Sequence, residues 1–234
     1  MNQPMNQSLA MANRAEAERS FIARTFMWMT LGLLTTAVVA FVVASSPTLI
    51  KIIYTNPMLT FGLLIGQVIL VLVLSAGINK LAPMVATLIF FAYAALTGLT
   101  FSSIFIAYDF GSIASTFVVT AGMFGILTIM GMGTKRDLTG IGTLAFIGLI
   151  GVLLMSLVNM FLRSDTLYWL ISILGVIIFV VLIARDAQRL KKMATEVTPD
   201  SEQAQRASIM GALVLYLDFI NLFLFLLRLL GGRR

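Results

Sequence analysis

An acidic residue interrupts one of the most apolar stretches of this chain, "LVLYLDFINLFLFLLRLLGG", which extends from Leu213 to Gly232 and contains Asp218. On insertion scales an Asp at the centre of a membrane helix costs about 2.5–3.5 kcal/mol, so its carboxyl group must be paired, protonated or hydrated. Asn221 follows three residues later and therefore shares its helical face. Asp218 is thus a candidate for handling protons or cations. The alternative is a structural Asp whose hydrogen bonds fix the register of its helix.

A second acidic residue, Asp186, ends the preceding apolar run, in "VVLIARDAQRLKK". It is either a boundary charge neutralised by Arg185 and Arg189 or the partner of Asp218. Two carboxyl groups within hydrogen-bonding distance cannot both ionise cheaply, so they share a proton and titrate as a coupled pair. The chain has no His, the residue that usually senses pH in the physiological range. An Asp186–Asp218 pair is therefore the pH sensor that the residue types favour.

Other polar side chains within the apolar stretches are uncharged, and two interpretations stay open for them. Gln67 stands in "GLLIGQVIL", and Ser102 and Ser103 end the hydroxyl-rich segment "ALTGLTFSS". Such hydroxyl groups either line a hydrated path for ions or donate hydrogen bonds to their own helix backbone. The sequence contains neither Cys nor His, which excludes thiol nucleophiles, thiolate metal sites and His-based catalysis.

The composition places these residues in a membrane, because it does not fit a soluble domain. Of the 234 residues, 59% are hydrophobic and only 11% are charged, too few to cover a water-exposed surface. Apolar stretches of about 20 residues recur, which is the length that crosses a bilayer as a helix. The sequence therefore predicts an all-α integral membrane bundle. The net charge of +6 then indicates basic loops that face anionic lipid, and not a nucleic-acid-binding protein.

Seven membrane-spanning helices are predicted, at residues 25–45, 57–78, 83–108, 112–132, 138–162, 167–184 and 209–230. Most connections between them are short, as in compact helix bundles. The sequence therefore predicts one membrane domain at residues 25–234, preceded by a polar cytoplasmic tail at residues 1–24. The longest connection, residues 185–208, is expected to continue the sixth span as a helix and to break near Pro199.

The basic residues predict the orientation of the bundle. Eleven of the 16 Lys and Arg residues fall in the tail and in the second, fourth and sixth connections. Cytoplasmic loops carry the excess of Lys and Arg, so the N-terminus is expected in the cytoplasm and the C-terminus outside. The segment from Met1 to Ser20 lacks the apolar core of a cleavable signal peptide.

The stretch "YLDFINLFLFLLRLLG", with Tyr216, Asp218 and Asn221, closely resembles the last membrane helix of the Bax inhibitor-1 family, also called the transmembrane Bax inhibitor motif family. The segments "AYAALTGLTFSSIFIAYD" and "TKRDLTGIG" and the region of Asp186 fit the same family in the same order. The resemblance covers essentially the whole chain, and the sequence of these segments is similar to that of a bacterial inner-membrane member.

The resemblance implies a bundle of seven helices in which six surround a central seventh. It also implies a pH-dependent calcium leak channel whose gate and sensor are two aspartates, at the positions of Asp186 and Asp218. In some members an Arg near the end of the second helix pairs with the first of these aspartates, and Lys80 is the nearest basic residue here. Certain bacterial members place a Glu on the ion path where this chain has the uncharged Gln67. Some bacterial relatives associate with a membrane-anchored quality-control protease.

We therefore expect a pH-sensitive leak channel for calcium or other cations in the bacterial inner membrane. The two aspartates are expected to hold calcium weakly and transiently, since an ion that is conducted must leave as well as enter. No other cofactor is expected. The residues expected to support the pair are Tyr216, Asn221, Lys80 and Arg185, and those expected along the ion path are Gln67, Ser102 and Ser103.

Two other functions are alternatives to this expectation. A regulatory protein would bind and modulate a membrane-anchored protease without transporting anything, and this alternative stays open. An intramembrane aspartyl protease also needs two aspartates on adjacent helices. Its second Asp follows a Gly-x-Gly pattern, however, whereas here Tyr216 and Leu217 precede Asp218. No enzymatic activity is therefore expected.

Overall fold

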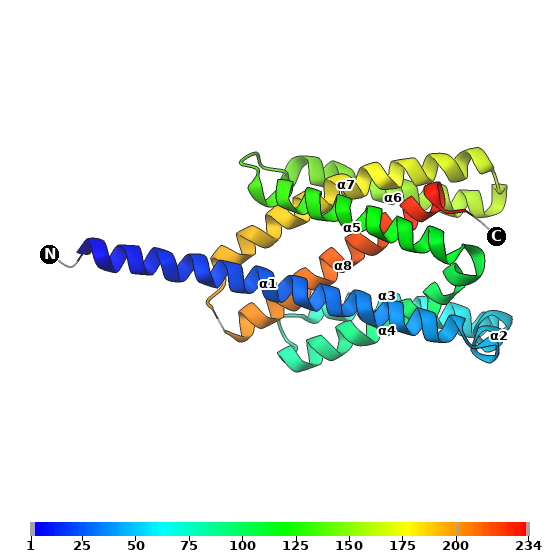
Figure 1. Cartoon of the computed structure of the whole chain (residues 1–234), viewed down its shortest axis with the longest axis horizontal. Helices are drawn as coiled ribbons and strands as arrows, with labels where there is room; N and C mark the ends of the chain where they lie inside the picture. Colours follow the sequence, from blue (N-terminus) through cyan, green and yellow to red (C-terminus); the bar gives the residue numbers. More distant parts are fainter. Residues whose placement is uncertain (1–2, 200, 233–234) are drawn as a thin grey trace. The chain divides into compact units, whose positions relative to one another are not determined.

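The computed structural model describes residues 3–199 and 201–232, which form eight α-helices and, within those ranges, no β-strand (Figure 1). The helices are α1 (Gln3–Ala44), α2 (Pro47–Thr55), α3 (Pro57–Gly77), α4 (Pro83–Ala107), α5 (Phe110–Gly133), α6 (Thr139–Leu162), α7 (Asp165–Glu196) and α8 (Glu202–Leu230). All of them except α2 are long and apolar enough to cross a membrane. The prediction of an all-α membrane bundle is confirmed.

The observed helices agree most closely with the predicted spans where the helix ends at a short loop. They extend beyond the predicted spans where the adjoining residues are polar. α1 begins at Gln3, so the backbone is already helical in most of the segment predicted as a tail. α7 continues to Glu196 and α8 begins at Glu202, on either side of Pro199, as predicted for the longest connection. The polar ends are rich in Ala, Gln, Glu, Lys and Arg, which are good helix formers. A change in polarity therefore marks the membrane boundary and not the end of the helix.

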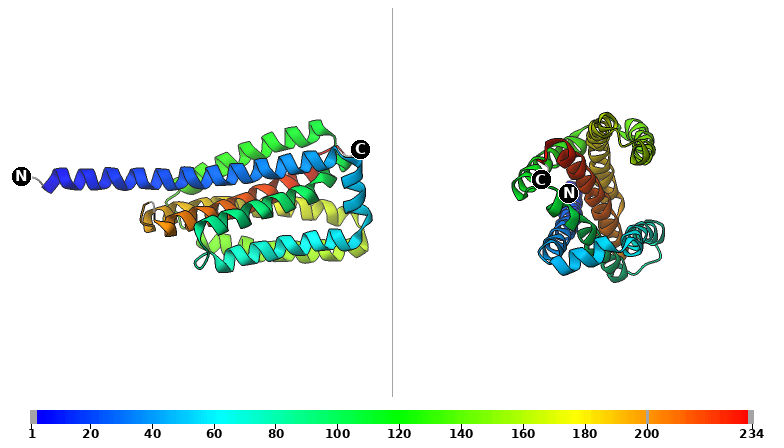
Figure 2. Two further views of the ribbon diagram at one scale, coloured as in Figure 1. Left: turned by 90° about the horizontal axis from the view of Figure 1, so that it is seen from below. Right: turned by 90° about the vertical axis from the view of Figure 1, so that its right-hand side faces the viewer.

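The short helix α2 was predicted as part of a connection. Ser46 begins it by accepting a hydrogen bond from the backbone N of Leu49 at 3.4 Å, and Pro47 occupies its first turn. Asn56 ends α2 and begins α3, accepting from the backbone N of Leu59 at 3.2 Å. Figure 2 shows α2 crossing from the end of α1 to the start of α3.

The chain divides into two compact units, which are described separately. Unit 1 contains the chain up to Ser103 together with Leu190–Leu213, and unit 2 contains Ile104–Arg189 and the chain from Val214 onward. The helices α4, α7 and α8 each contribute to both units. The single membrane domain predicted at residues 25–234 stays a prediction.

In unit 1 small residues allow helices to approach closely. A Cβ atom at Gly98 of α4 would lie 2.7 Å from the backbone oxygen of Thr36 in α1. The hydroxyl of Thr36 in turn donates to the backbone oxygen of Ala94 at 2.9 Å. At Gly211, in the first half of α8, a Cβ would lie 3.1 Å from the side chain of Thr25. Close approach of this kind drives helix association in lipid, where apolar side chains gain little from avoiding water.

In unit 2 the second half of α8 packs against α5 and α7. The ring of Phe219 lies 5.3 Å from that of Phe117 and 5.5 Å from that of Phe124, both in α5. A Cβ at Gly175 of α7 would lie 2.5 Å from the ring of Phe225. The apolar window of α8 is 72% buried, against 6% to 33% in the other six spans. α8 is therefore the helix whose side chains are most fully enclosed by protein.

Candidate functional site

Asp186 and Asp218, the two acidic residues singled out by the sequence, meet in unit 2. Asp186 lies in α7 and Asp218 in α8, and only 6% and 5% of their surfaces are exposed. Their side chains come within hydrogen-bonding reach of each other. Because a carboxylate has no hydrogen to donate, a hydrogen bond between two carboxyl groups requires that one of them hold a proton. This arrangement would allow a single proton to link the two helices.

Arginine side chains provide the positive charge beside this pair. Nε and Nη2 of Arg185 donate to the same oxygen of Asp186, Oδ1, at 2.8 and 2.5 Å. Arg189, one turn further along α7, also acts electrostatically on Asp186. Charge-assisted bonds of this kind stabilise the ionised form of a carboxyl group. Arg185 was predicted to support the pair, and the structure places it in direct contact with Asp186.

The other carboxyl oxygen of Asp218, Oδ2, is buried and has no hydrogen-bond partner among the residues that the structure describes. Its helix neighbours Leu215 and Phe219 are themselves buried and apolar. A buried polar atom without a partner is unfavourable. A proton, a water molecule or a cation bound at this oxygen would remove that cost.

Two glycines bring α5 and α6 close to the pair. A Cβ at Gly131 of α5 would overlap the backbone oxygen of Ala184 in α7, and one at Gly142 of α6 would overlap Cδ of Arg185. α5 therefore touches the backbone of α7 two residues before Asp186, and Gly142 provides the space that the Arg185 side chain occupies. The sequence does not predict these contacts, because the spacing of glycines along one helix does not identify the helix that each one meets.

Gln188 fixes the connection between α5 and α6 to α7. Its Nε2 donates to the backbone oxygen of Arg136 at 2.8 Å, and its Oε1 accepts from the backbone N of Leu138 at 3.0 Å. The side chain is buried, although a Gln in "RDAQRLKK" is typical of a solvated helix face. Gln188 was not predicted, and little in the sequence marks it.

Two further residues expected to support the pair also lie in unit 2. Tyr216 is completely buried in α8. Asn221 donates from Nδ2 to the backbone oxygen of Leu217, in its own helix, at 2.8 Å. This bond satisfies part of the hydrogen-bonding capacity of Asn221 locally. The support of Asp218 by Tyr216 and Asn221 stays a prediction.

The remaining predicted residues lie in unit 1. Lys80 is exposed in the turn between α3 and α4, and its pairing with Asp186 stays a prediction. On α3, Gln67 donates to the hydroxyl of Thr100 at 3.4 Å. Ser102 and Ser103 donate at 2.6 and 3.0 Å to backbone oxygens of their own helix, α4. Bonding back to the helix was one of the two interpretations for these hydroxyl groups, and their place on an ion path stays a prediction.

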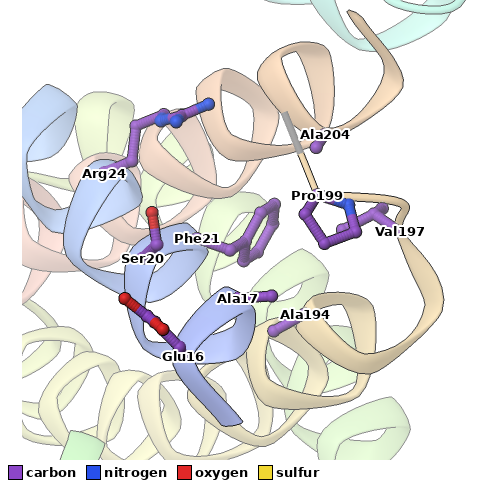
Figure 3. A pocket seen from close by; sticks show the side chains of 9 residues that line it. All are labelled: Glu16, Ala17, Ser20, Phe21, Arg24, Ala194, Val197, Pro199 and Ala204. Atoms are coloured by element: carbon purple, nitrogen blue, oxygen red, sulfur yellow. The ribbon is translucent and has the colours of Figure 1, made fainter. Parts of the chain in front are cut away.

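Figure 3 shows a different kind of site, a cavity of about 340 Å³ in unit 1. The ring of Phe21, in α1, points toward Pro199 in the connection between α7 and α8. Ala17 and Ala194 contribute apolar surface, and Glu16 and Arg24 lie on the α1 side. The complete lining is Glu16, Ala17, Ser20, Phe21, Arg24, Ala194, Val197, Pro199 and Ala204. With one acid and one base, this cavity does not reproduce the chemistry of the aspartate pair.

The aspartate pair is a sparse set of ligands for a metal ion. Across residues 3–199 and 201–232, three or more acidic side chains do not gather at any one place. Calcium takes about six to eight oxygen ligands in its protein sites. The arrangement therefore suits brief contact with a cation better than tight binding.

Comparison with known proteins gives matches along nearly the entire chain. The sequence model of the family described as "Inhibitor of apoptosis-promoting Bax1" matches residues 18–234. The inner membrane protein YbhL of Escherichia coli is 52% identical over 217 residues, which cover 92% of this chain and 93% of that protein. An uncharacterized protein of Deinococcus radiodurans is 41% identical over 97% of each chain. An uncharacterized membrane protein of Streptococcus pyogenes is 40% identical over 78% of this chain and 79% of its own.

Proposed function

This chain belongs to the Bax inhibitor-1 family, and on that premise we propose that it is a pH-sensitive leak channel for calcium or other cations. The proposal rests on one observation, the direct approach of the buried carboxyl groups of Asp186 and Asp218 on two different membrane-spanning helices. The name of the Escherichia coli relative supports a place in the bacterial inner membrane. The distribution of Lys and Arg supports a cytoplasmic N-terminus.

The pair acts as the gate through its shared proton. While one proton is held between Asp186 and Asp218, a hydrogen bond joins α7 to α8. When the pH rises and that proton leaves, two negative charges face each other in a poorly hydrated place, where their repulsion is strong. The two helices then separate or recruit a cation. The leak is therefore closed at low pH and increases as the pH rises.

Calcium enters this scheme as a transient ligand. Hard cations prefer oxygen, and the ionised pair offers two carboxylates, of which Oδ2 of Asp218 has no partner within the described residues. Such a small set of ligands binds weakly, and weak binding suits conduction. The chain performs no catalytic step in this scheme, and no cofactor takes part.

The test is calcium flux into proteoliposomes at a series of pH values, with the wild-type chain and Asp218→Asn. Flux through the wild type is expected to increase with pH. The amide of Asn can donate to Asp186 at every pH, so the variant is expected to stay closed and to lose the pH dependence. Glu196→Gln, a change to an exposed acid at the end of α7, is the matched control and is expected to behave like the wild type.

Two results would contradict the proposal, one concerning the pH sensor and the other concerning the channel. An unchanged pH dependence in Asp218→Asn would show that the pair is not the sensor. A wild-type chain that is folded in the vesicles but passes no cation at any pH would show that it is not a leak channel.

A further inference from the structure

A polar cavity of about 410 Å³ lies in unit 2, where α6 ends, α7 begins and α8 ends. Its polar lining includes Asn159, Arg163, Ser164, Asp165, Tyr168 and Arg228. Two guanidinium groups and one carboxylate give this lining an excess of one positive charge. None of these residues belongs to the aspartate pair or to its contacts, and the proposed channel function does not use them.

The guanidinium of Arg228 is held in place by aromatic rings. It lies 5.6 Å from the centre of the Tyr168 ring and 5.5 Å from that of the Phe225 ring. Stacking of this kind orients the guanidinium plane and leaves its N–H groups free to donate. In the part of the chain that the structure describes, no ion pair joins Arg228 or Arg163 to a carboxylate. Both positive charges are therefore available to a ligand.

Arg163 occupies a strained backbone position at the edge of the cavity. Its φ and ψ are 51° and 36°, in the left-handed region, and its backbone N donates to the oxygen of Asn159 at 2.8 Å. The side chain of Asn159 also accepts from the backbone N of Ser164, at 2.9 Å. Helices that end in this way commonly place Gly here, because a side chain strains the left-handed conformation. Strained backbone positions cluster at ligand-binding sites, where the surrounding structure holds them in place.

The cavity is expected at the level of the lipid headgroups. It is formed by the connection between two spans and by the last turn of a third, and the ends of spans reach the membrane–water boundary. Trp169 follows the lining residue Tyr168 and is 60% exposed, as is typical of aromatic residues at this boundary. On α6, the lining residue Met160 and its neighbour Phe161 are exposed and apolar. An occupant would thus meet positive charge and an apolar surface side by side.

We propose that this cavity binds the phosphodiester group of a membrane phospholipid, with Arg163 and Arg228 donating to the phosphate oxygens. The planar guanidinium matches the geometry of phosphate and can donate two parallel hydrogen bonds. The acyl chains then lie along the exposed apolar end of α6. Asp165 repels an anion, so its charge weakens the binding of the phosphate.

The experiment titrates the full-length chain in detergent with a short-chain phosphatidylglycerol and counts bound lipid by native mass spectrometry. Arg163→Gly and Arg228→Gln are each expected to raise the dissociation constant about tenfold, the effect of removing one charge-assisted interaction. Gly adopts the left-handed conformation without strain, so Arg163→Gly is expected to fold at least as stably as the wild type. Asp165→Asn is expected to strengthen binding a few-fold, because it removes a like charge.

The control Arg19→Gln removes the same charge from an exposed position in unit 1, outside the cavity, and is expected to leave binding unchanged. An equal loss in this control would overturn the proposal, since binding would then follow net charge alone. Equal affinity in the wild type, Arg163→Gly and Arg228→Gln would overturn it as well. Inorganic phosphate and glycerol 3-phosphate are added as competitors that lack acyl chains. If either displaced the lipid at equal concentration, the occupant would be a soluble phosphate and the lipid assignment would be wrong.

Discussion

Arg185 is the residue that determines how easily the aspartate pair loses its proton in the proposed mechanism. Its two hydrogen bonds to Asp186 stabilise a negative charge there. We predict that Arg185→Gln moves the midpoint of the calcium flux to higher pH, by about one unit, the equivalent of one charge-assisted hydrogen bond. The flux assay in proteoliposomes measures the midpoint directly.

The matched control for this change is Arg189→Gln, which removes the same charge from an exposed position on the same helix. It is expected to move the midpoint less, because the structure places the guanidinium of Arg185, and not that of Arg189, in contact with the Oδ1 oxygen. A midpoint that stays in place or moves to lower pH in Arg185→Gln would show that the ion pair has no part in gating.

Individual residues differ in how far the sequence reveals them. Asp186 and Asp218 were predicted because acidic residues in apolar runs are few and each requires a partner. The hydrogen bond from Asn221 to the backbone of its own helix was not predicted, because the spacing of residues along a helix does not determine the rotamer of an Asn side chain or its hydrogen-bond partner. Gln188 was missed for a similar reason, since its partners are backbone groups of a distant connection.

Among the elements, α5 contacts the backbone of α7 close to the pair. A Cβ at Gly131 would overlap the backbone of Ala184, and a backbone cannot move aside as a side chain does. We predict that Gly131→Ala destabilises the fold by about 1–3 kcal/mol, the usual cost of overpacking. Unfolding of the purified chain in mixed micelles, followed by circular dichroism, measures the change.

Two glycines on the same helix provide controls for this prediction. A Cβ at Gly122 or Gly125 would meet no atom within 4 Å. Gly122→Ala and Gly125→Ala are therefore expected to be neutral or slightly stabilising, since Ala is the better helix former. If Gly131→Ala were as stable as the Gly122→Ala and Gly125→Ala variants, the close contact between α5 and the backbone of α7 at Gly131 would be contradicted.

The elements themselves were largely predictable. Each of the seven spans was found by its length and apolar composition, which follow from the thickness of the bilayer. α2 was missed because nine residues are too few to cross a membrane. The sequence nevertheless contains a signal for α2, a capping residue followed by a proline in the first helical turn. This pattern occurs at Ser46-Pro47, where α2 begins, and again at Asn56-Pro57, where α3 begins. The glycine contacts between helices depend on tertiary packing and leave no such signal.

For the whole molecule, the orientation in the membrane follows from the basic residues. We predict that alkaline phosphatase fused after Arg234 is active in cells and that a green fluorescent protein at the same position is dark. Both outcomes correspond to a C-terminus outside the cytoplasm. The opposite pattern would reverse the predicted orientation. Fusions at Lys135, in the connection between α5 and α6, serve as the cytoplasmic reference.

The division into two units was not predictable from the sequence. Its boundaries fall inside α4, α7 and α8, next to Ser103, Arg189 and Leu213. A boundary within a continuous helix needs no Pro, no Gly-rich linker and no change in polarity. A single domain was predicted because most connections between the helices are short and no linker separates them, and it stays a prediction. A protease partner is likewise a prediction that rests on the family resemblance alone.

The contrast in burial between α3 and α8 has a consequence for how this chain tolerates mutation. Only 6% of the apolar window of α3 is buried, whereas 72% of that of α8 is. Lipid accepts any apolar side chain, so selection on α3 acts on composition and leaves the identity of most residues free. In α8 each side chain meets a fixed neighbour, and selection acts on identity. In a saturation mutagenesis library, most positions of α3 are therefore expected to tolerate any apolar residue. Most positions of α8 are expected to tolerate few substitutions.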